Sequence, residues 1–214
     1  PGTLERNDRN DVWGRVMGRH LRTSDRKPLA TPQRILVVRL DRIGDVVLTT
    51  PVIQRLREAY PDAFIAMMVR PVCRELVDGH PALNEVISYD KDGEQAGWWS
   101  TVQFARELRR YQFDTALVVH PTRRSHWIAW LAGIPTRIGY DRKSGWLLTH
   151  RVPHHKQEGE RHEAEYAMEL LRVLGLDSSG PLRPHVPIVP EHDQAVGQLL
   201  SLAGVKAGEV LVAI

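Results

Sequence analysis

The chain has 214 residues, of which 42% are apolar and 26% are charged. These values are typical of a globular protein with a sizeable core, and the length allows one full domain and part of a second. The formal net charge of +3 favours acidic partners such as phosphates or anionic lipid. It does not by itself indicate nucleic acid, which we do not expect as a partner. The single cysteine, Cys73, excludes an intrachain disulfide and a cysteine-based metal site.

Residues 1–33 differ from the rest of the chain because they are polar and basic. They include apolar residues at helical spacing, namely Val12, Trp13, Val16, Met17 and Leu21. A basic amphipathic helix of this kind can lie on an anionic membrane surface. The alternative is a tail without stable structure, because Gly14 and Gly18 each weaken a helix by roughly 1 kcal/mol. No apolar run approaches the roughly 20 residues that cross a bilayer, and no signal-peptide core is visible, so we expect a cytoplasmic protein.

Residues 34–60 are expected to form a buried strand, a turn and a helix. Residues 35–38, Ile-Leu-Val-Val, are a continuous apolar run, as expected of a strand covered on both faces. The run gives way to polar residues at 41–45, where Gly44 permits a sharp turn. Thr50 can cap the following helix, because a threonine hydroxyl accepts from the free amides of a first turn. Asp45 is therefore expected just beyond the carboxyl end of a strand, where open α/β folds bind their ligands.

Strand and helix patterns alternate along the next part of the chain. We expect further strands at residues 63–69, 84–89, 114–120, 136–140 and 148–152. We expect helices at residues 51–60, 72–79, 98–111, 125–132 and 161–174. This alternation predicts an α/β fold with a doubly wound, parallel, Rossmann-like sheet.

The composition changes after residue 176. Residues 177–190 contain four prolines, which cannot lie inside a helix or a central strand, so we expect a linker there. Residues 191–203 are expected to be helical, and residues 209–214 to be the first strand of another sheet. The expected organisation is an extension at 1–33, a domain at 34–176, a linker at 177–190 and the start of a truncated second domain at 191–214.

Two polar sites follow predicted strands. The first turn holds Gly44 alone and lacks the G-x-G-x-x-G pattern of dinucleotide-binding turns. Asp45 in that turn is a general base, an acceptor of a hydrogen bond from a sugar hydroxyl, or an acid that caps a helix. Arg123 and Arg124 follow a later strand and suit a phosphate or carboxylate ligand. The alternative for these two arginines is a solvated pair at a helix end.

Two further groups of residues are ambiguous. His150, His154, His155 and His162 are close in sequence, but zinc sites use tighter spacings and need a fourth ligand that is not identified here. We therefore assign no metal. The pair Trp98-Trp99 beside a polar stretch faces a ligand or packs against the core.

Four segments of the chain resemble a known family. They are RILVVRLDRIGDVVLTTPVIQRLREAYPDAFIAMMV, HPALNEVISYD, YQFDTALVVHPTRRSHWIAWLAGIPTRIGY and RHEAEYAMELLRVLG. In this order they resemble the bacterial heptosyltransferases that build the lipopolysaccharide inner core, glycosyltransferase family 9. The resemblance covers residues 34–175 and leaves residues 1–33 outside.

The resemblance implies a GT-B architecture, in which two Rossmann-like domains face each other across a cleft. The amino-terminal domain would bind the sugar acceptor, and the second domain would bind the nucleotide sugar, ADP-heptose. Asp45 matches the proposed base of the family. Arg42, Gly44, Arg123 and Arg124 are the implied acceptor-binding residues. The donor-binding residues belong to the second domain and have no counterpart here.

The implied reaction is transfer of heptose from ADP-heptose to a Kdo–lipid A type acceptor with inversion. No cofactor and no catalytic metal are expected, and ADP-heptose is a co-substrate. A lipid-linked acceptor would place the protein at the inner face of the inner membrane. The 214-residue chain alone is expected to be inactive. Two alternatives are another GT-B transferase with a different nucleotide sugar and a non-catalytic α/β module that binds a glycan.

Overall fold

The computed structural model describes residues 29–154, 162–206 and 208–209. The predicted amphipathic helix before residue 29 lies outside the described residues, as does nearly all of the strand predicted at 209–214. The predicted domain limits therefore stay predictions. In the described part of the chain, no helix is both long enough and apolar enough to cross a lipid bilayer.

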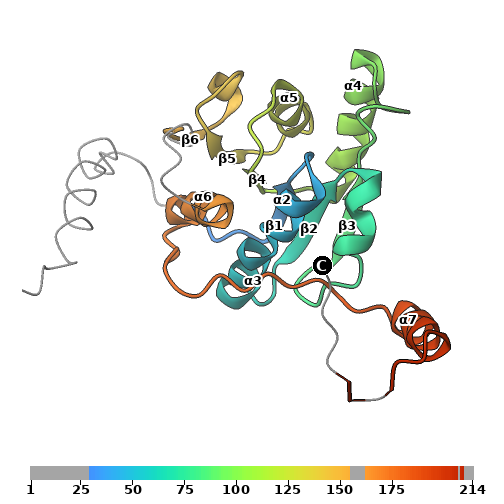
Figure 1. Cartoon of the computed structure of the whole chain (residues 1–214). Helices are drawn as coiled ribbons and strands as arrows, with labels where there is room; N and C mark the ends of the chain where they lie inside the picture. The colour runs from blue at the N-terminus through green and yellow to red at the C-terminus, as the bar shows by residue number, and fades with distance from the viewer. Residues whose placement is uncertain (1–28, 155–161, 207, 210–214) are drawn as a thin grey trace, which may run out of the picture. The chain divides into compact units, whose positions relative to one another are not determined.

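A six-stranded parallel sheet forms the centre of the fold (Figure 1). Its strands are β1 (Arg34–Val38), β2 (Phe64–Val69), β3 (Glu85–Ser88), β4 (Thr115–Val118), β5 (Thr136–Tyr140) and β6 (His150–Val152). Their order in the sheet is β3-β2-β1-β4-β5-β6, and all neighbouring pairs are parallel. The predicted doubly wound, Rossmann-like fold is confirmed.

Helices connect these strands and cover both faces of the sheet. The α-helices are α2 (Ile43–Val47), α3 (Thr50–Ala59), α4 (Trp98–Leu108), α5 (Arg123–Leu131), α6 (Glu163–Glu169) and α7 (Pro190–Leu202). Short 3-10 helices are η2 (Pro71–Leu76), η3 (Arg109–Tyr111), η4 (Gly145–Leu147) and η6 (Leu170–Leu174). Helices α3 and α6 contact each other, and so do α4 and α5, in two layers that Figure 1 shows on opposite sides of the sheet.

The alternation of side chains along β1 divides the core into two halves. Ile35 and Val37 pack into the cluster that includes residues of α3 and α6. Leu36 and Val38 pack into the other cluster, with residues of α4 and α5. Because both faces of the strand are buried, every position from 35 to 38 needs an apolar residue, and this explains the continuous run in the sequence.

Residues 41–47 differ from the prediction of a sharp turn. Arg42 is the extended residue before α2, and the amide of Val46 donates to its carbonyl over 3.1 Å. Val46 is buried in the core, which stabilises the short helix. Gly44 lies inside this helix and is not a turn residue. The predicted cap is also wrong, because the Thr50 hydroxyl donates to the carbonyl of Val47 instead of accepting from a first-turn amide.

The predicted linker lies against α3. The amide of His185 donates to the Thr50 hydroxyl over 2.9 Å, and Arg55 reaches the carbonyl of Ser179 over 3.4 Å. Leu182 packs against the core cluster of that face. These contacts connect the proline-rich stretch to the first domain.

Candidate active site

The candidate site lies where the chain changes direction in the sheet. Strand β1 has β2 on one side and β4 on the other, so the connections that leave β1 and β4 diverge at their carboxyl ends (Figure 1). This divergence opens the crevice in which doubly wound sheets bind ligands. The loops after β1, β4 and β5 all begin at this edge of the sheet, because the three strands are parallel.

Arg39 follows β1 directly and organises the site. Its side chain is only 1% exposed and contacts three carboxylates. Its Nε lies 2.8 Å from Oδ1 of Asp41. Its Nη2 lies 3.1 Å from Oδ1 of Asp45 and 2.8 Å from Oε1 of Glu163. The three acids come from the loop after β1, from α2 and from α6, so a single guanidinium connects three elements.

Of the three acids around Arg39, Asp41 has a clearly shifted pKa. Burial raises the pKa of Asp41 from its ordinary value of 3.8 to about 6. Arg39 lowers this pKa, while the carboxylates of Asp45 and Glu163 raise it. Asp41 therefore changes its protonation state near neutral pH, within the range in which acid–base groups are useful.

Asp45 is the most accessible of the three acids. Its side chain is 27% exposed, against 14% for Asp41 and 18% for Glu163. It lies in the first turn of α2, yet this helix begins without a side-chain cap and the Asp45 carboxylate contacts Arg39. The capping explanation for this acid is therefore wrong. A carboxylate that is both held in place and partly exposed can meet a substrate hydroxyl.

A cavity of about 120 Å³ adjoins Arg39 and two of its three acids, Asp41 and Glu163, whereas Asp45 is not part of the cavity wall. Its walls include Asp41, Glu163, His120 at the end of β4, and Arg142 and Lys143 after β5. The Nδ1 atom of His120 lies 3.6 Å from Oδ2 of Asp41. Ligand pockets usually enclose about 300–1,000 Å³, so this cavity can hold only part of a sugar substrate.

Sequence patterns did not single out Arg39, Asp41, His120 or Glu163. Arg39 and Asp41 are polar residues that follow the carboxyl end of β1, which is a usable signal for a site. His120 ends a predicted strand and gives a weaker signal of the same kind. Glu163 is 124 residues from Arg39, and no local pattern connects the two.

The predicted acceptor residues Arg42 and Gly44 lie at the start of α2 and are exposed. A Cβ atom added at Gly44 would meet no atom within 4 Å. The fold therefore does not require a glycine at this position, and the open space leaves the α2 backbone accessible to a ligand.

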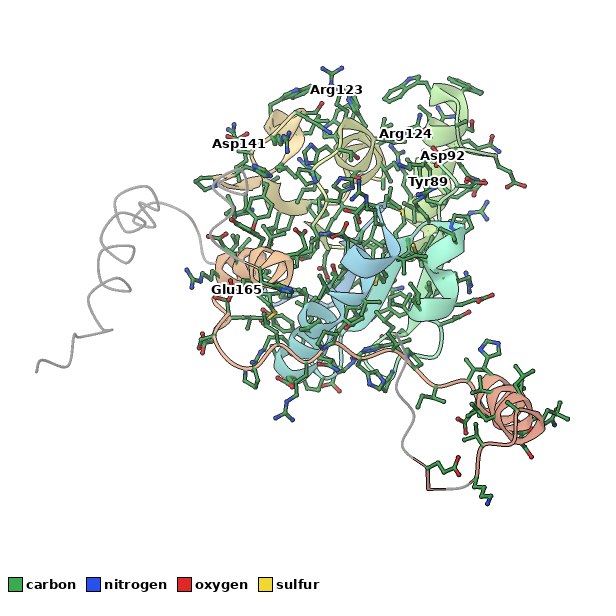
Figure 2. All side chains as sticks on the ribbon, viewed as in Figure 1. Tyr89, Asp92, Arg123, Arg124, Asp141 and Glu165 are labelled. Carbon is green, nitrogen blue, oxygen red and sulfur yellow. The ribbon has the colours of Figure 1, made fainter. Side chains whose placement is uncertain are left out.

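Arg123 and Arg124 differ in what they contact. Arg123 projects outward at the beginning of α5, whereas Arg124 is directed toward the segment that carries Asp92 (Figure 2). The guanidinium of Arg124 donates to the carbonyls of Lys91 over 2.8 Å and Ala96 over 2.7 Å. Arg124 thus fastens the loop before α4, and its role in acceptor binding stays a prediction, as does that of Arg123.

The histidines between residues 150 and 162 have different surroundings. His162 precedes α6, where its ring accepts from the amide of Ala164 and completes a capping box with Glu165. His154 packs edge-on against Tyr140, with ring centroids 5.4 Å apart. His155 lies outside the described residues, and no group of three or more metal-ligating side chains is found among the residues that are described.

Comparisons with known proteins extend over most of the described chain. The sequence model of the family described as "Glycosyltransferase family 9 (heptosyltransferase)" matches residues 101–195. Lipopolysaccharide heptosyltransferase 2 of Escherichia coli K12 is 28% identical over 107 residues, which are 50% of this chain and 31% of that protein. The chain spans less than half the length of the curated relatives that it matches.

Solved structures agree with the sequence relatives. The glycosyl transferase family 9 protein of Veillonella parvula superposes with a TM-score of 0.75 at 24% identity, covering 88% of this chain and 57% of that one. ADP-heptose lipopolysaccharide heptosyltransferase II of E. coli has a TM-score of 0.59 at 25% identity, covering 78% of this chain and 50% of that one. Sequence and fold together confirm the predicted resemblance of this chain to the heptosyltransferases of glycosyltransferase family 9.

Proposed function

We propose that this chain is the acceptor-binding part of a heptosyltransferase of the lipopolysaccharide core. The observation that carries the proposal is Asp45, a partly exposed carboxylate that Arg39 holds at the ligand-binding edge of the sheet. The relatives named above support the reaction class. ADP-heptose would be the co-substrate, and a Kdo–lipid A type glycolipid would be the acceptor.

The proposed chemistry is a single inverting displacement. Asp45 accepts the proton of an acceptor hydroxyl, while the hydroxyl oxygen forms a bond to the anomeric carbon of the heptose. The bond from that carbon to the diphosphate oxygen breaks, and ADP leaves with its electron pair. Arg39 contacts Oδ1 of Asp45 over 3.1 Å, and this contact supports a role for the other oxygen, Oδ2, as the proton acceptor. Positioned groups of this kind contribute about 10²- to 10⁴-fold to a rate.

The leaving diphosphate carries negative charge that must be balanced. Cationic side chains and helix amino-termini can do this without a metal, so the proposal includes no catalytic metal and no cofactor. The groups that bind ADP-heptose would belong to a second domain. The neighbouring acid Asp41, whose pKa burial raises to about 6, can take up a proton at the end of the reaction.

The proposal is tested by assaying the intact gene product with ADP-heptose and Kdo–lipid A. We expect Asp45→Asn to lower kcat by about 10²-fold or more, because the variant cannot accept the proton. The matched control is Asp78→Asn, which removes another carboxylate that contacts an arginine, Arg74, at 3.1 Å but lies on an exposed surface. Near-wild-type turnover of Asp45→Asn would show that Asp45 is not the base.

Donor competition separates this proposal from a transferase with another nucleotide sugar. We expect ADP-heptose to be used in preference to UDP- and GDP-sugars. Equal use of several donors would contradict the assignment of the donor. Binding of the glycolipid without any transfer would instead favour a non-catalytic module.

A further inference from the structure

Five of the six tryptophans of the chain come from three elements that meet on one side of the fold. We call Trp98, Trp99, Trp127, Trp130 and Trp146 the tryptophan cluster. The ring of Trp127 is at its centre, with centroids 5.3 Å from Trp98, 5.4 Å from Trp130 and 5.8 Å from Trp146. Trp99 follows Trp98 at the start of α4.

The cluster is exposed to an unusual extent. Trp98 is 51% exposed, Trp99 72%, Trp130 45% and Trp146 65%. Single exposed apolar residues are common on proteins, but ring contacts here join Trp127 to Trp98, Trp130 and Trp146 across three elements, and such a group indicates an interaction surface. Packing of the core does not explain the cluster, because about half or more of each of these four side chains is exposed to solvent.

Basic residues accompany the tryptophans. Arg123 precedes Trp127 by four residues and Trp130 by seven, so the three residues share one face of α5. Figure 2 shows Arg123 projecting outward from the beginning of this helix. The guanidinium of Arg106 lies 5.9 Å from the ring centroid of Trp99. The cluster therefore has positive charge beside exposed indole rings.

Two acidic residues on the neighbouring loops, Asp92 and Asp141, are paired with arginines, whereas Glu94 on the loop before α4 is exposed. Asp141, on the loop before η4, has its carboxylate 3.7 Å from Arg151. Asp92, on the loop before α4, contacts Arg70 at 2.7 Å. These pairs reduce the negative charge that an anionic partner would meet at the edges of the cluster.

We propose that the tryptophan cluster is a docking surface for an anionic lipid bilayer. Indole rings concentrate at the boundary between lipid headgroups and water, because each ring has a large apolar body and one N–H donor. Arginine and lysine beside them are attracted to anionic lipids. The exposed large apolar side chains of α4, α5 and η4 are all tryptophan, with no exposed leucine, isoleucine or phenylalanine. Indole rings flanked by arginines suit the headgroup region of an anionic bilayer. Tryptophan and arginine are also enriched at the centres of subunit interfaces, and the experiments below distinguish the two occupants.

The position of the cluster relates it to the candidate active site. Residues 141–147 run from the cavity, where Arg142 and Lys143 are part of the wall, to Trp146 in η4. A substrate held in the bilayer would thus be presented beside the cavity. This last step rests on the proposed function, whereas binding of the cluster to lipid does not.

Fluorescence quenching by lipid tests the proposal directly. We would use Trp13→Phe, so that all tryptophan emission comes from the cluster, and vesicles of phosphatidylcholine and phosphatidylglycerol with bromine on the acyl chains. We expect emission to be quenched by these vesicles and hardly by vesicles of phosphatidylcholine alone. Because no glycolipid and no nucleotide sugar are present, the result does not depend on the transferase activity.

Substitutions then locate the surface by co-sedimentation with the same vesicles. We expect Trp99→Gln with Trp146→Gln to weaken binding by about tenfold or more, since two apolar rings leave the interface. We expect Arg106→Gln with Arg123→Gln to weaken it by about 25-fold, at about fivefold for each charge. The controls are Val72→Gln and Arg183→Gln, which alter exposed residues outside the cluster and should bind like the parent.

Two results would overturn the proposal. One is binding that is lost when residues 1–28 are deleted but is unchanged in both double variants. The other is a protein that shows no quenching and sediments as a dimer, which Trp99→Gln with Trp146→Gln converts to a monomer. The second result would assign the cluster to contact between two copies of the chain.

Discussion

At the scale of single residues, Arg39 is the group on which the site depends most. It is buried and faces three acids, so its removal leaves three carboxylates without their cation. We expect Arg39→Met to lower the free energy of unfolding by about 3–5 kcal/mol, as is usual when one partner of a buried ion pair is lost. Urea unfolding at pH 7 measures this effect.

The control for this variant is Arg70→Met. Arg70 also contacts a carboxylate, that of Asp92 at 2.7 Å, but the pair is at the surface. A loss within about 1 kcal/mol is expected there. If the two variants lose the same stability, the Arg39 contacts do not support the fold.

Asp41 gives the stability a dependence on pH. Its pKa is about 6 in the folded chain and close to 3.8 in the unfolded chain. Between these values the folded chain binds more protons, so the contribution of Asp41 is largest below pH 3.8 and is lost as the pH rises through 6. This loss is up to about 3 kcal/mol. We expect Asp41→Asn to remove it, which urea unfolding from pH 4 to pH 7 would show. An unchanged slope would contradict the raised pKa.

His126 acts in the opposite direction. It is fully buried in α5, and burial lowers its pKa from 6.5 to about 4, with a further decrease from Lys143. The unfolded chain binds the proton more tightly, so stability is complete above pH 6.5 and falls as the pH drops through 4. From pH 7.5 to pH 5 the loss is about 2 kcal/mol. We expect His126→Gln to show a smaller loss over this range in the same unfolding measurement. An equal loss in both proteins would place the titrating group elsewhere.

At the scale of elements, a substitution in α2 can distinguish a structural role of Gly44 from a role in acceptor binding. A helical glycine with open space around it costs stability relative to alanine. We expect Gly44→Ala to unfold with a free energy that is unchanged or higher by about 0.5–1 kcal/mol. If the acceptor approaches this backbone, the same variant should raise the acceptor KM. An unchanged KM would remove Gly44 from the acceptor site.

Two neighbouring arginines at the start of α5 differ in their contact with the loop before α4. Arg124 holds the carbonyls of Lys91 and Ala96, whereas Arg123 projects outward. We expect Arg124→Ala to increase hydrogen exchange of amides 91–96 by about tenfold, since two charge-assisted hydrogen bonds are lost. Arg123→Ala should leave exchange in this loop as it was. Equal exchange in the two variants would mean that Arg124 does not fasten the loop.

At the scale of the whole molecule, the sheet was predictable because its strands are continuous apolar runs separated by helical patterns. Helix α2 was not predicted, because Val46 is its only buried residue and a five-residue helix shows no helical periodicity. The arrangement of the site was not predictable, because Arg39 and Glu163 are brought together only by the completed fold. Trp98 and Trp99 were visible as a pair, but the contacts of Trp98 with Trp127 and of Trp127 with Trp146 depend on how three elements pack.

The contact between Arg39 and Glu163 has a consequence for the biosynthesis of the protein. Strand β1 leaves the ribosome early, whereas α6 follows after the five other strands have been made. Until then Asp45 is present, but the guanidinium that orients it lacks one of its three acids. A nascent chain thus has the proposed base long before it has the complete set of contacts around Arg39, and we expect the proposed activity to begin only after α6 has docked.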